Sequence, residues 1–243
     1  MIDWLDDDSL DFPPSHRALG PDTDAPGLLA AGGELEPRRL EAAYRRGIFP
    51  WYSPGQPALW WAPDPRMVLK TADFKLARSL RKTVQRFIAT PGCEIRVDHD
   101  RAAVLKACAG VPREGQNGTW IVPELQAAYL AWPAMHSIET WMHGELVGGL
   151  YGVNLGRMFY GESMFMRRTD ASKIALCALV CLCRHFDIPW IDCQQNTRHL
   201  ASLGAAEVPR NAFEAHVATH VDEATPGPWT YHPAHWQRLF EPT

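Results

Sequence analysis

The sequence contains no hydrophobic run long enough to cross a lipid bilayer. Its longest uninterrupted apolar stretch, residues 174–183, has ten residues, whereas a transmembrane helix needs about 20. The N-terminus carries Asp3, Asp6, Asp7 and Asp8, although a secretory signal requires positive charge followed by an apolar segment. We therefore expect a cytoplasmic protein that does not contact a membrane.

A cysteine-rich, disulfide-stabilised composition is also absent, since the chain has six cysteines in 243 residues. Most of them lie in apolar segments, and a chain of this length folds without disulfide bonds, so we expect free, buried thiols. Cys177, Cys181 and Cys183 precede His185, but a zinc site needs four ligands that converge on one point. Because Cys177 and Cys181 are one helical turn apart among apolar neighbours while Cys183 points elsewhere, we expect no metal site.

A strong charge of either sign is absent from the chain as a whole, whose net charge is −4. Nine acidic residues and one basic residue lie within residues 1–36, so the rest of the chain is net positive. No internal repeat or low-complexity tract occurs, and 46% of the residues are hydrophobic. These features predict one large or two small globular domains with a mildly basic body.

Turn-forming residues dominate the N-terminal part. The first 35 residues are rich in Asp, Pro and Gly and predict an extended segment wrapped on the surface. Pro37 and Gly47 bracket a predicted helix over residues 37–46. Residues 48–66 contain five prolines and three tryptophans. Because so many prolines exclude an interior strand or helix, this stretch predicts an ordered aromatic loop.

The next predicted helix begins after Asp73, which is expected to cap it, and runs to about Ile88. Its apolar residues recur at helical spacing on one face. Four basic residues share another face: Arg78, Arg81, Lys82 and Arg86. Such a face either is simply solvated or follows the phosphates of a nucleic acid in a salt-sensitive, sequence-independent contact.

From Glu94 onward strands and helices alternate. The patterns predict strands at 94–98, 137–142, 146–154, 158–165, 189–194 and 205–208, and helices at 100–109, 123–132, 171–186 and 197–203. This order resembles the GCN5-related N-acyltransferase fold. The expected class is therefore α/β (α+β), with a small N-terminal domain over residues 1–92 and an acyltransferase-like catalytic domain over 93–243. Its sheet is expected to be mixed and mostly antiparallel.

The loop that would hold the pyrophosphate of an acyl-CoA in that fold has no glycine. It reads MRRTDASK over residues 166–173, whereas backbone N–H groups cradle a pyrophosphate best in a glycine-rich loop at a helix N-terminus. The sequence therefore disfavours coenzyme A, and another molecule must carry the acyl group.

Several separate motifs, in order, resemble the bacterial leucyl/phenylalanyl-tRNA-protein transferases. They are GLLAAGGEL (27–35), YRRGIFPWY (44–52), WWAPDPR (60–66), GTWI (118–121), ELVGGLYGV (145–153), FYGESMF (159–165), ASKIAL (171–176), IDCQ (191–194) and ASLGAAEVPR (201–210). The resemblance implies transfer of Leu, Phe or Met from aminoacyl-tRNA to proteins that begin with Lys or Arg, which marks them for degradation. It implies no metal or other cofactor, and we expect a monomer.

The resemblance places Asp192 and Gln194 at the reaction centre, with the Asp as a base that acts through the Gln. The two residues are two apart on a predicted strand, so their side chains should share a face. An aspartate is a weak base for an α-amine, because the two pKa values differ by about 4 units. We therefore expect Asp192 to orient the amine and stabilise its developing positive charge while Gln194 fixes the geometry. Without the resemblance, Asp192 would be interpreted as a strand-end residue bonded to turn amides.

Further residues are assigned to the two substrates. Glu162 is expected to receive the Lys or Arg side chain of the acceptor, although a solvated or internally paired carboxylate at the strand edge is the alternative. Trp51 and Trp120 are expected to stack on the terminal adenosine of tRNA. The resemblance also implies an apolar pocket for the donor side chain, although residues at such positions often belong simply to the core. That pocket comprises Leu150, Phe159, Met164, Leu176 and Leu179.

Three other functions remain open at this point. An acyl-CoA N-acyltransferase would need the pyrophosphate loop that the sequence lacks. A noncatalytic RNA-binding module would explain the basic helices and tryptophans but would leave Asp192 and Gln194 without a role. A tRNA-dependent transferase that modifies acidic N-termini would place a basic residue where Glu162 stands.

Overall fold

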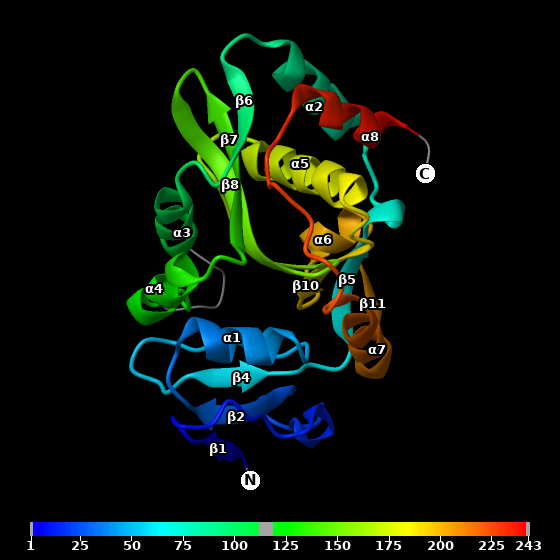
Figure 1. The fold of residues 1–243 in the computed structure, drawn as a ribbon. Coiled ribbons are helices and arrows are strands. Elements are labelled where there is room, and N and C mark those ends of the chain that lie inside the picture. Colours follow the sequence, from blue (N-terminus) through cyan, green and yellow to red (C-terminus); the bar gives the residue numbers. More distant parts are fainter. Residues whose placement is uncertain (1, 112–118, 242–243) are drawn as a thin grey trace.

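Two β-sheets organise the computed structural model, which describes residues 2–111 and 119–241 (Figure 1). Gly118 of the GTWI motif lies outside the described residues. The small sheet has the strand order β1-β2-β4-β3. Its strands are β1 (Asp3–Leu5), β2 (Leu28–Gly32), β3 (Phe49–Pro50) and β4 (Leu59–Trp61). Helix α1 (Pro37–Tyr44) lies between this sheet and the rest of the molecule.

The large sheet has seven strands in the order β11-β5-β10-β9-β8-β7-β6. Their bounds are β5 (Arg66–Lys70), β6 (Cys93–Val97), β7 (Met135–Met142), β8 (Glu145–Leu155), β9 (Met158–Met166), β10 (Trp190–Gln194) and β11 (Ala206–Val208). Strands β6 to β9 pair in succession in antiparallel fashion, and the strands predicted at 137–142, 146–154 and 158–165 correspond to β7, β8 and β9. Strand β10 pairs with β9 in parallel. The predicted mixed, mostly antiparallel sheet is therefore confirmed.

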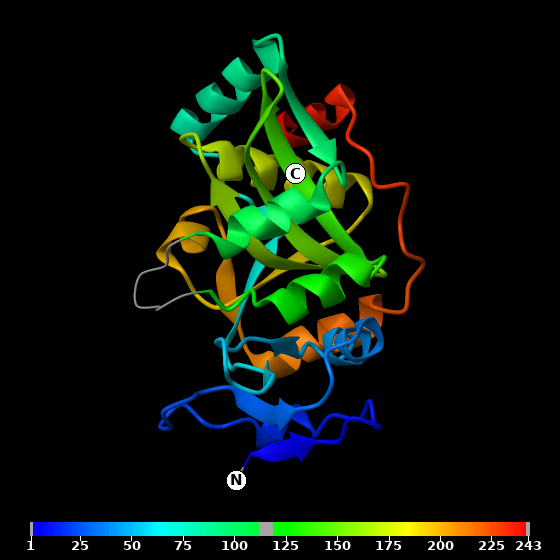
Figure 2. The ribbon, with the colours of Figure 1, turned by 90° about the vertical axis from the view of Figure 1, so that its left-hand side faces the viewer.

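Helices cover both faces of this sheet, as Figure 2 shows. They are α2 (Arg78–Ala89), α3 (Arg101–Ala109), α4 (Pro123–Ala131), α5 (Ala171–His185), α6 (Arg198–Ser202), α7 (Arg210–His220) and α8 (Gln237–Phe240). One buried core lies between α5 and the sheet, and a second joins α3, α4 and the small sheet to the opposite face. Because α5 is covered by β7, β8 and β9 below and by the C-terminal segment above, nearly all of its residues are buried.

The strands β9 and β10 pair over only three residues each, Met158–Tyr160 with Trp190–Asp192. Strand β9 then continues to Met166 along β8, while β10 ends at Gln194 beside β5. The two strands therefore diverge after Tyr160. This divergence leaves room in the middle of the sheet, and the candidate site lies there.

The N-terminal third differs from the sequence-based expectation. All five residues of β2 are buried, so residues 1–35 are not simply an extended surface segment. Residues 48–66 contain two short strands, β3 and β4, because four of their five prolines lie outside these strands, two between β3 and β4 and two after β4. The predicted aromatic loop is thus partly a sheet.

The helix expected to begin after Asp73 begins at Arg78 instead, and Ala77 is its N-cap residue. Asp73 belongs to a 3₁₀ turn. The intervening segment stays extended because the Lys75 N–H donates to the Leu203 carbonyl at 2.9 Å and Phe74 is buried in the core. The long-range contact with Leu203 therefore prevents Asp73 from serving as the N-cap of this helix.

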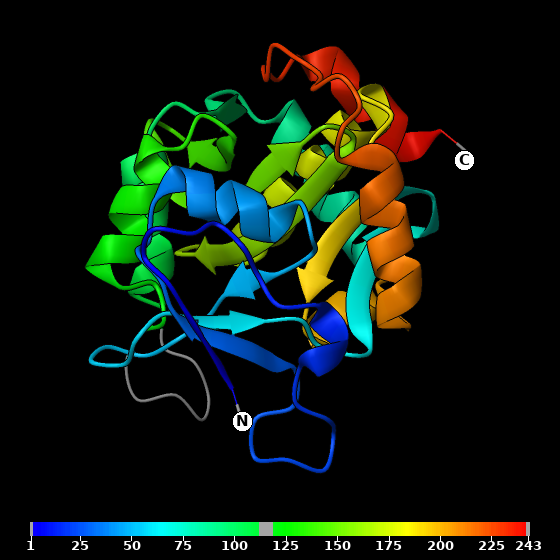
Figure 3. The same ribbon diagram turned by 60° about the horizontal axis from the view of Figure 1, so that its bottom comes forward.

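Strand β5 was not anticipated, and it pairs with β10 and β11 in the large sheet. The chain thus passes from the small sheet to the large sheet between Trp61 and Arg66, upstream of the domain boundary expected after residue 92. Helix α7 follows β11 and lies beside β5 (Figure 3). The C-terminal segment ends in α8, which packs on α5.

Candidate active site

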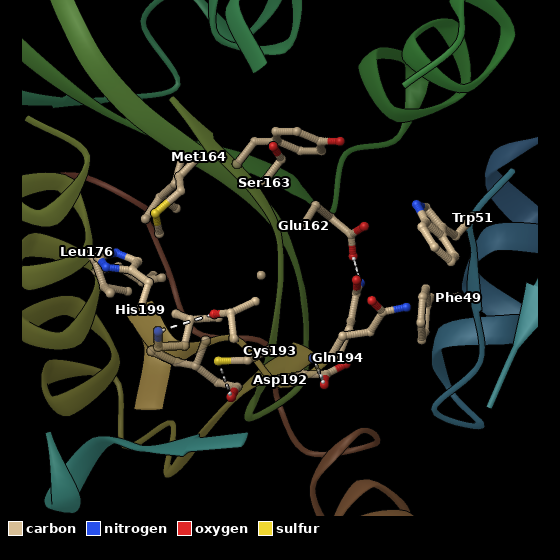
Figure 4. A pocket seen from close by; sticks show the side chains of 18 of the residues that line it. Phe49, Trp51, Glu162, Ser163, Met164, Leu176, Asp192, Cys193, Gln194 and His199 are labelled. Carbon is tan, nitrogen blue, oxygen red and sulfur yellow. Dashed lines mark hydrogen bonds between the residues drawn. The ribbon is translucent and has the colours of Figure 1, made fainter. Parts of the chain in front are cut away.

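A cavity of about 650 Å³ opens where β9 and β10 diverge (Figure 4). Phe49, Trp51, Glu162 and Gln194 line one end of it, the polar end. The other end, the apolar end, is lined mostly by apolar side chains of β8, β9 and α5, and His199 of α6 also lies there. Figure 4 shows Glu162 and Gln194 facing each other near the two aromatic rings, with Met164 and Leu176 farther along. A cavity with one apolar end and a few convergent polar groups is typical of a binding site for a small group.

The apolar end contains four of the five residues assigned to the donor side chain. Leu150 and Met164 face each other across β8 and β9, and Leu176 and Leu179 come from successive turns of α5. Phe159 is not among the lining residues. It is fully buried, and its ring centroid lies 5.5 Å from that of Trp229. Because β10 is still paired with β9 at this position, the sheet has not yet opened there.

A bulge in β9 sets the position of Glu162. Tyr151 pairs with Ser163 and the next residue, Gly152, pairs with Gly161, so Glu162 is the extra residue of its strand. A side chain at Gly152 would bring its Cβ within 2.2 Å of the Tyr160 carbonyl oxygen. The bulge therefore requires glycine there, and bulges re-aim side chains next to functional sites.

The carboxylate of Glu162 accepts hydrogen bonds from neutral groups. Tyr44 Oη and Gln194 Nε2 donate to its Oε1 at 2.6 and 2.9 Å, and Tyr129 Oη donates to its Oε2 at 3.1 Å. Burial raises the pKa of Glu162 to about 7, and nearby Asp192 adds to this effect while the three donors oppose it. The residue therefore exchanges protons near neutral pH.

Asp192 is fully buried and faces a cation. Arg66 Nε donates to Oδ1 at 2.8 Å and Arg66 Nη2 donates to Oδ2 at 2.6 Å, which makes a bidentate ion pair. The backbone N–H of Gln194 donates to Oδ1 as well, at 2.9 Å. The pairing register shifts between Asp192 and Gln194, and Gln194 has a φ of 61°. Simple strand alternation therefore fails here, and Gln194 points to Glu162 while Asp192 points to Arg66.

Arg66 was not among the expected site residues. Its guanidinium lies 4.6 Å from the ring centroids of both Phe49 and Phe213, and its side chain is 1% exposed. It thus joins β3, β5, β10 and α7 at one point. Arg66 could have been identified from the sequence because it is the last residue of the WWAPDPR motif. In the same way, Tyr44 is the first residue of the YRRGIFPWY motif. Tyr129 belongs to none of the recognised motifs.

Both tryptophans assigned to the adenosine line the cavity. Trp51 is half-buried and lies 5.3 Å from Trp61 by ring centroids, and its carbonyl accepts from Trp61 Nε1. The four basic residues of α2 do not line the cavity. Arg78, Lys82 and Arg86 are exposed, and Arg81 packs over the ring of Phe240.

Metal-binding and membrane-spanning features are absent from residues 2–111 and 119–241. No group of three or more His, Cys, Asp or Glu side chains is arranged to hold a metal ion there. No helix in the same ranges has the length and hydrophobicity needed to span a bilayer. Cys177, Cys181 and Cys183 are buried free thiols in α5, as expected.

Comparison with known proteins decides the family. A model described as leucyl/phenylalanyl-tRNA protein transferase matches residues 68–218, and the model of its N-terminal domain matches residues 33–64. The transferase of Leptothrix cholodnii is 63% identical over 244 residues, which cover 98% of this chain and 95% of that protein. The chain belongs to the leucyl/phenylalanyl-tRNA-protein transferase family. The resemblance inferred from the sequence motifs is therefore confirmed.

Other members of the transferase family match this chain over nearly its whole length. The protein of Methylibium petroleiphilum is 62% identical over 98% of this chain and 91% of its own length. The protein of Paraburkholderia xenovorans is 59% identical over 95% of this chain and 95% of its own length. The two transferase family models meet between residues 64 and 68, where the chain passes from the small sheet to the large one.

Proposed function

We propose that the cavity between β9 and β10 is where an aminoacyl group passes from tRNA to the α-amino group of a protein. Membership of the family makes this chain an aminoacyltransferase that takes leucine or phenylalanine from aminoacyl-tRNA. Its acceptors are proteins that begin with Lys or Arg, and the transfer marks them for degradation. The observation that carries the assignment is that the same cavity contains an apolar end and a buried carboxylate and amide.

Aminolysis of an aminoacyl ester needs little chemical driving force, because the ester is already activated. The enzyme therefore contributes mainly by positioning the two reactants and by stabilising the charge that develops as they join. A cavity wide enough for an aminoacyl group, and closed by side chains from both sheets, meets the first demand. The polar end at Glu162 and Gln194 meets the second.

The apolar end holds the donor side chain in this proposal. Leucine and methionine side chains line it, and they suit unbranched and γ-branched groups such as Leu, Phe and Met. Discrimination by shape alone is worth about 10- to 200-fold in rate, so Ile and Val are expected to be transferred at that disadvantage.

The polar end receives the acceptor. Glu162 offers a buried negative charge to the N-terminal residue of the acceptor, and Gln194 holds the Glu162 carboxylate in place. Asp192 contributes by anchoring Gln194, because its Oδ1 accepts the Gln194 N–H while Arg66 holds both of its oxygens. The aspartate therefore orients the reaction centre through its neighbours.

The end of the tRNA is assigned to the aromatic side of the cavity. The half-buried Trp51 is assigned to stacking on the terminal adenosine, which needs no sequence readout, and Trp120, which is buried but lines the cavity, is assigned beside it. The exposed basic face of α2 is assigned to the acceptor-stem phosphates. A cytoplasmic location belongs to the same proposal, since both substrates are found there.

A transfer assay tests the function directly. Labelled Leu-tRNA or Phe-tRNA is mixed with the protein and with one of two peptides, which begin with Arg or with Asp and are otherwise identical. We expect label on the Arg peptide alone, and a strong loss of label with Gln194→Ala. Label on the Asp peptide alone would favour the transferase of acidic N-termini. Label on neither peptide, with tRNA binding intact, would leave an RNA-binding module.

The role of α2 is tested by salt dependence. A variant in which Arg78, Lys82 and Arg86 are all changed to Ala is expected to bind tRNA more weakly, with the slope of log affinity against log salt reduced by about 2 to 3. Lys106→Ala, on α3, is the matched control. An unchanged slope in the triple variant would show that this face is merely solvated.

A further inference from the structure

The hydrogen bonds of Glu162 leave its two oxygens unequal. An ionised carboxylate has about two acceptor positions on each oxygen. Both positions of Oε1 are taken, by Tyr44 and Gln194. Among residues 2–111 and 119–241, Oε2 accepts a hydrogen bond from Tyr129 at 3.1 Å, and the hydroxyl of Tyr129 also lies 2.6 Å from that of Tyr44. Oε2 therefore has room for a further donor, and Glu162 lines the cavity.

This arrangement discriminates between the cationic groups of an acceptor. The guanidinium of arginine binds a carboxylate best as a fork, with one N–H on each oxygen. Because Oε1 is already saturated, Glu162 cannot accept that fork. A primary amine needs only one acceptor position. The primary amine that acceptors beginning with Lys and with Arg have in common is the α-amino group, which is also the nucleophile.

We infer that Glu162 is the general base of the transfer, with Oε2 binding the α-amino group of the acceptor rather than its side chain. This inference rests on the function proposed above. The amine nitrogen attacks the ester carbonyl carbon and the C–N bond forms. One proton of the nitrogen passes to Oε2, and the same proton then passes to the departing 3′-oxygen of the tRNA as the C–O bond breaks. The products are an amide and a free tRNA hydroxyl.

Asp192 is unsuited to this role because of its partners. Both of its oxygens are held by the guanidinium of Arg66, and Oδ1 also accepts the Gln194 N–H. Proton transfer to Asp192 would break the ion pair inside a buried site. Gln194 then acts as a positioning residue, because its backbone is fixed by Asp192 and its amide by Glu162.

The groups around Glu162 set where it titrates. Tyr44 comes from α1, Tyr129 from α4 and Tyr151 from the neighbouring strand β8, while Asp192 from β10 is neutralised by Arg66 from β5. Burial raises the pKa of Glu162 to about 7. At a pH near 7, a base with this pKa is ionised in a large fraction of the molecules and can accept a proton. Its conjugate acid is acidic enough to give the proton up again.

The Glu162→Gln variant distinguishes two roles of Glu162, as a general base and as the group that binds the side chain of the acceptor. Single-turnover transfer is measured at saturating donor with two peptides that begin with Arg or with citrulline, its neutral isostere. If Glu162 is the base, both rates fall by about 100-fold or more, and the preference for Arg over citrulline is unchanged. If Glu162 reads the side chain, the preference collapses and the rate on citrulline is unchanged, which overturns the inference.

The pH dependence provides an independent readout. The ratio of wild-type to Glu162→Gln rates cancels the ionisation of the peptide amine. We expect this ratio to rise with pH through an inflection near 7 and then level off. Tyr44→Phe removes a donor that stabilises the ionised carboxylate, so the inflection moves to higher pH. A ratio that does not vary with pH, or an inflection that Tyr44→Phe leaves in place, overturns the inference.

Tyr160→Phe is the matched control for Tyr44→Phe. The Tyr160 hydroxyl donates to the Tyr44 carbonyl at 2.8 Å and does not contact Glu162, so its loss is expected to leave the inflection unmoved. A shift equal to that of Tyr44→Phe would assign the effect to packing and overturn the inference. Failure of the function itself is a different result, because the wild type would then transfer no label at any pH.

Discussion

Two buried carboxylates stand on neighbouring strands of this transferase, and they are held in opposite ways. Asp192 on β10 is bound by the guanidinium of Arg66. Glu162 on β9 is bound by two tyrosine hydroxyls and a side-chain amide. Asp192 is thus paired with a full positive charge, whereas the hydrogen-bond donors of Glu162 are neutral, polar groups. A cation holds a carboxylate ionised, whereas neutral donors only partly offset the cost of burying its charge.

The two carboxylates therefore have different roles in the site. The Arg66–Asp192 pair ties together strands of both sheets and α7, and it sets the bulge from which Gln194 points to Glu162. Glu162 retains an unsaturated oxygen and titrates near neutrality. One carboxylate is therefore an anchor and the other is free to take part in chemistry.

Removing the cation should have the largest effect. Arg66→Ala leaves Asp192 buried without its partner, and we expect a loss of about 3–5 kcal/mol in the free energy of unfolding, measured with urea. The double variant Arg66→Met with Asp192→Leu is the control, because it removes both charges and should recover much of the loss. An Arg66→Ala variant as stable as the wild type would contradict the anchoring role.

The second effect concerns Glu162 and depends on pH. Its pKa rises from 4.5 to about 7 on folding, so the folded state binds the proton more tightly than the unfolded state does. Relative to Glu162→Gln, the wild type is therefore most stable below pH 4.5. It should lose about 3 kcal/mol as the pH rises to about 7, and no more above that. Urea unfolding of both proteins at several pH values measures the difference, and a flat difference would refute it.

A smaller effect is expected from one of the neutral donors. Tyr129→Phe removes the contact of 3.1 Å to Oε2, and the hydroxyl that is lost was shared with Tyr44. We expect a loss of about 1 kcal/mol above pH 8, where Glu162 is ionised, and less at pH 5, where it is protonated. Thermal unfolding at the two pH values checks this, and an equal loss at both would indicate a packing effect only.

The smallest change in the free energy of unfolding is expected for a surface residue far from both carboxylates. Lys82 is exposed on α2 and contacts neither carboxylate. Lys82→Ala should change the free energy of unfolding by no more than about 0.5 kcal/mol at any pH. A larger change, measured by the same urea titration, would mean that this face of α2 supports the fold.

Local signals explain which elements were predictable. Asp100 caps α3 through its Oδ1, which accepts from the Ala103 N–H at 2.9 Å, and Pro123 opens α4. Alternation and short turns mark the meander from β7 to β9. These features depend on residues close in the chain, so the sequence predicted them. Strand β5 was missed because its partners, β10 and β11, lie more than 100 residues away.

The sequence by itself determined the family, the order of elements from β6 to β11 and four of the five residues expected to hold the donor side chain. Leu150, Met164, Leu176 and Leu179 were all expected in the cavity, and Phe159 was the exception. The register shift in β10, which separates Gln194 from Asp192, had no local signal.

Only the tertiary structure decided how the two carboxylates behave. Tyr44 reaches Glu162 across 118 positions of sequence, and Arg66 reaches Asp192 across 126. The charge and reactivity of a carboxylate depend on what surrounds it, and folding brings those surroundings from distant segments. The residue types at the site follow from the sequence, but their division into an anchor and a titrating group follows from burial and long-range partners.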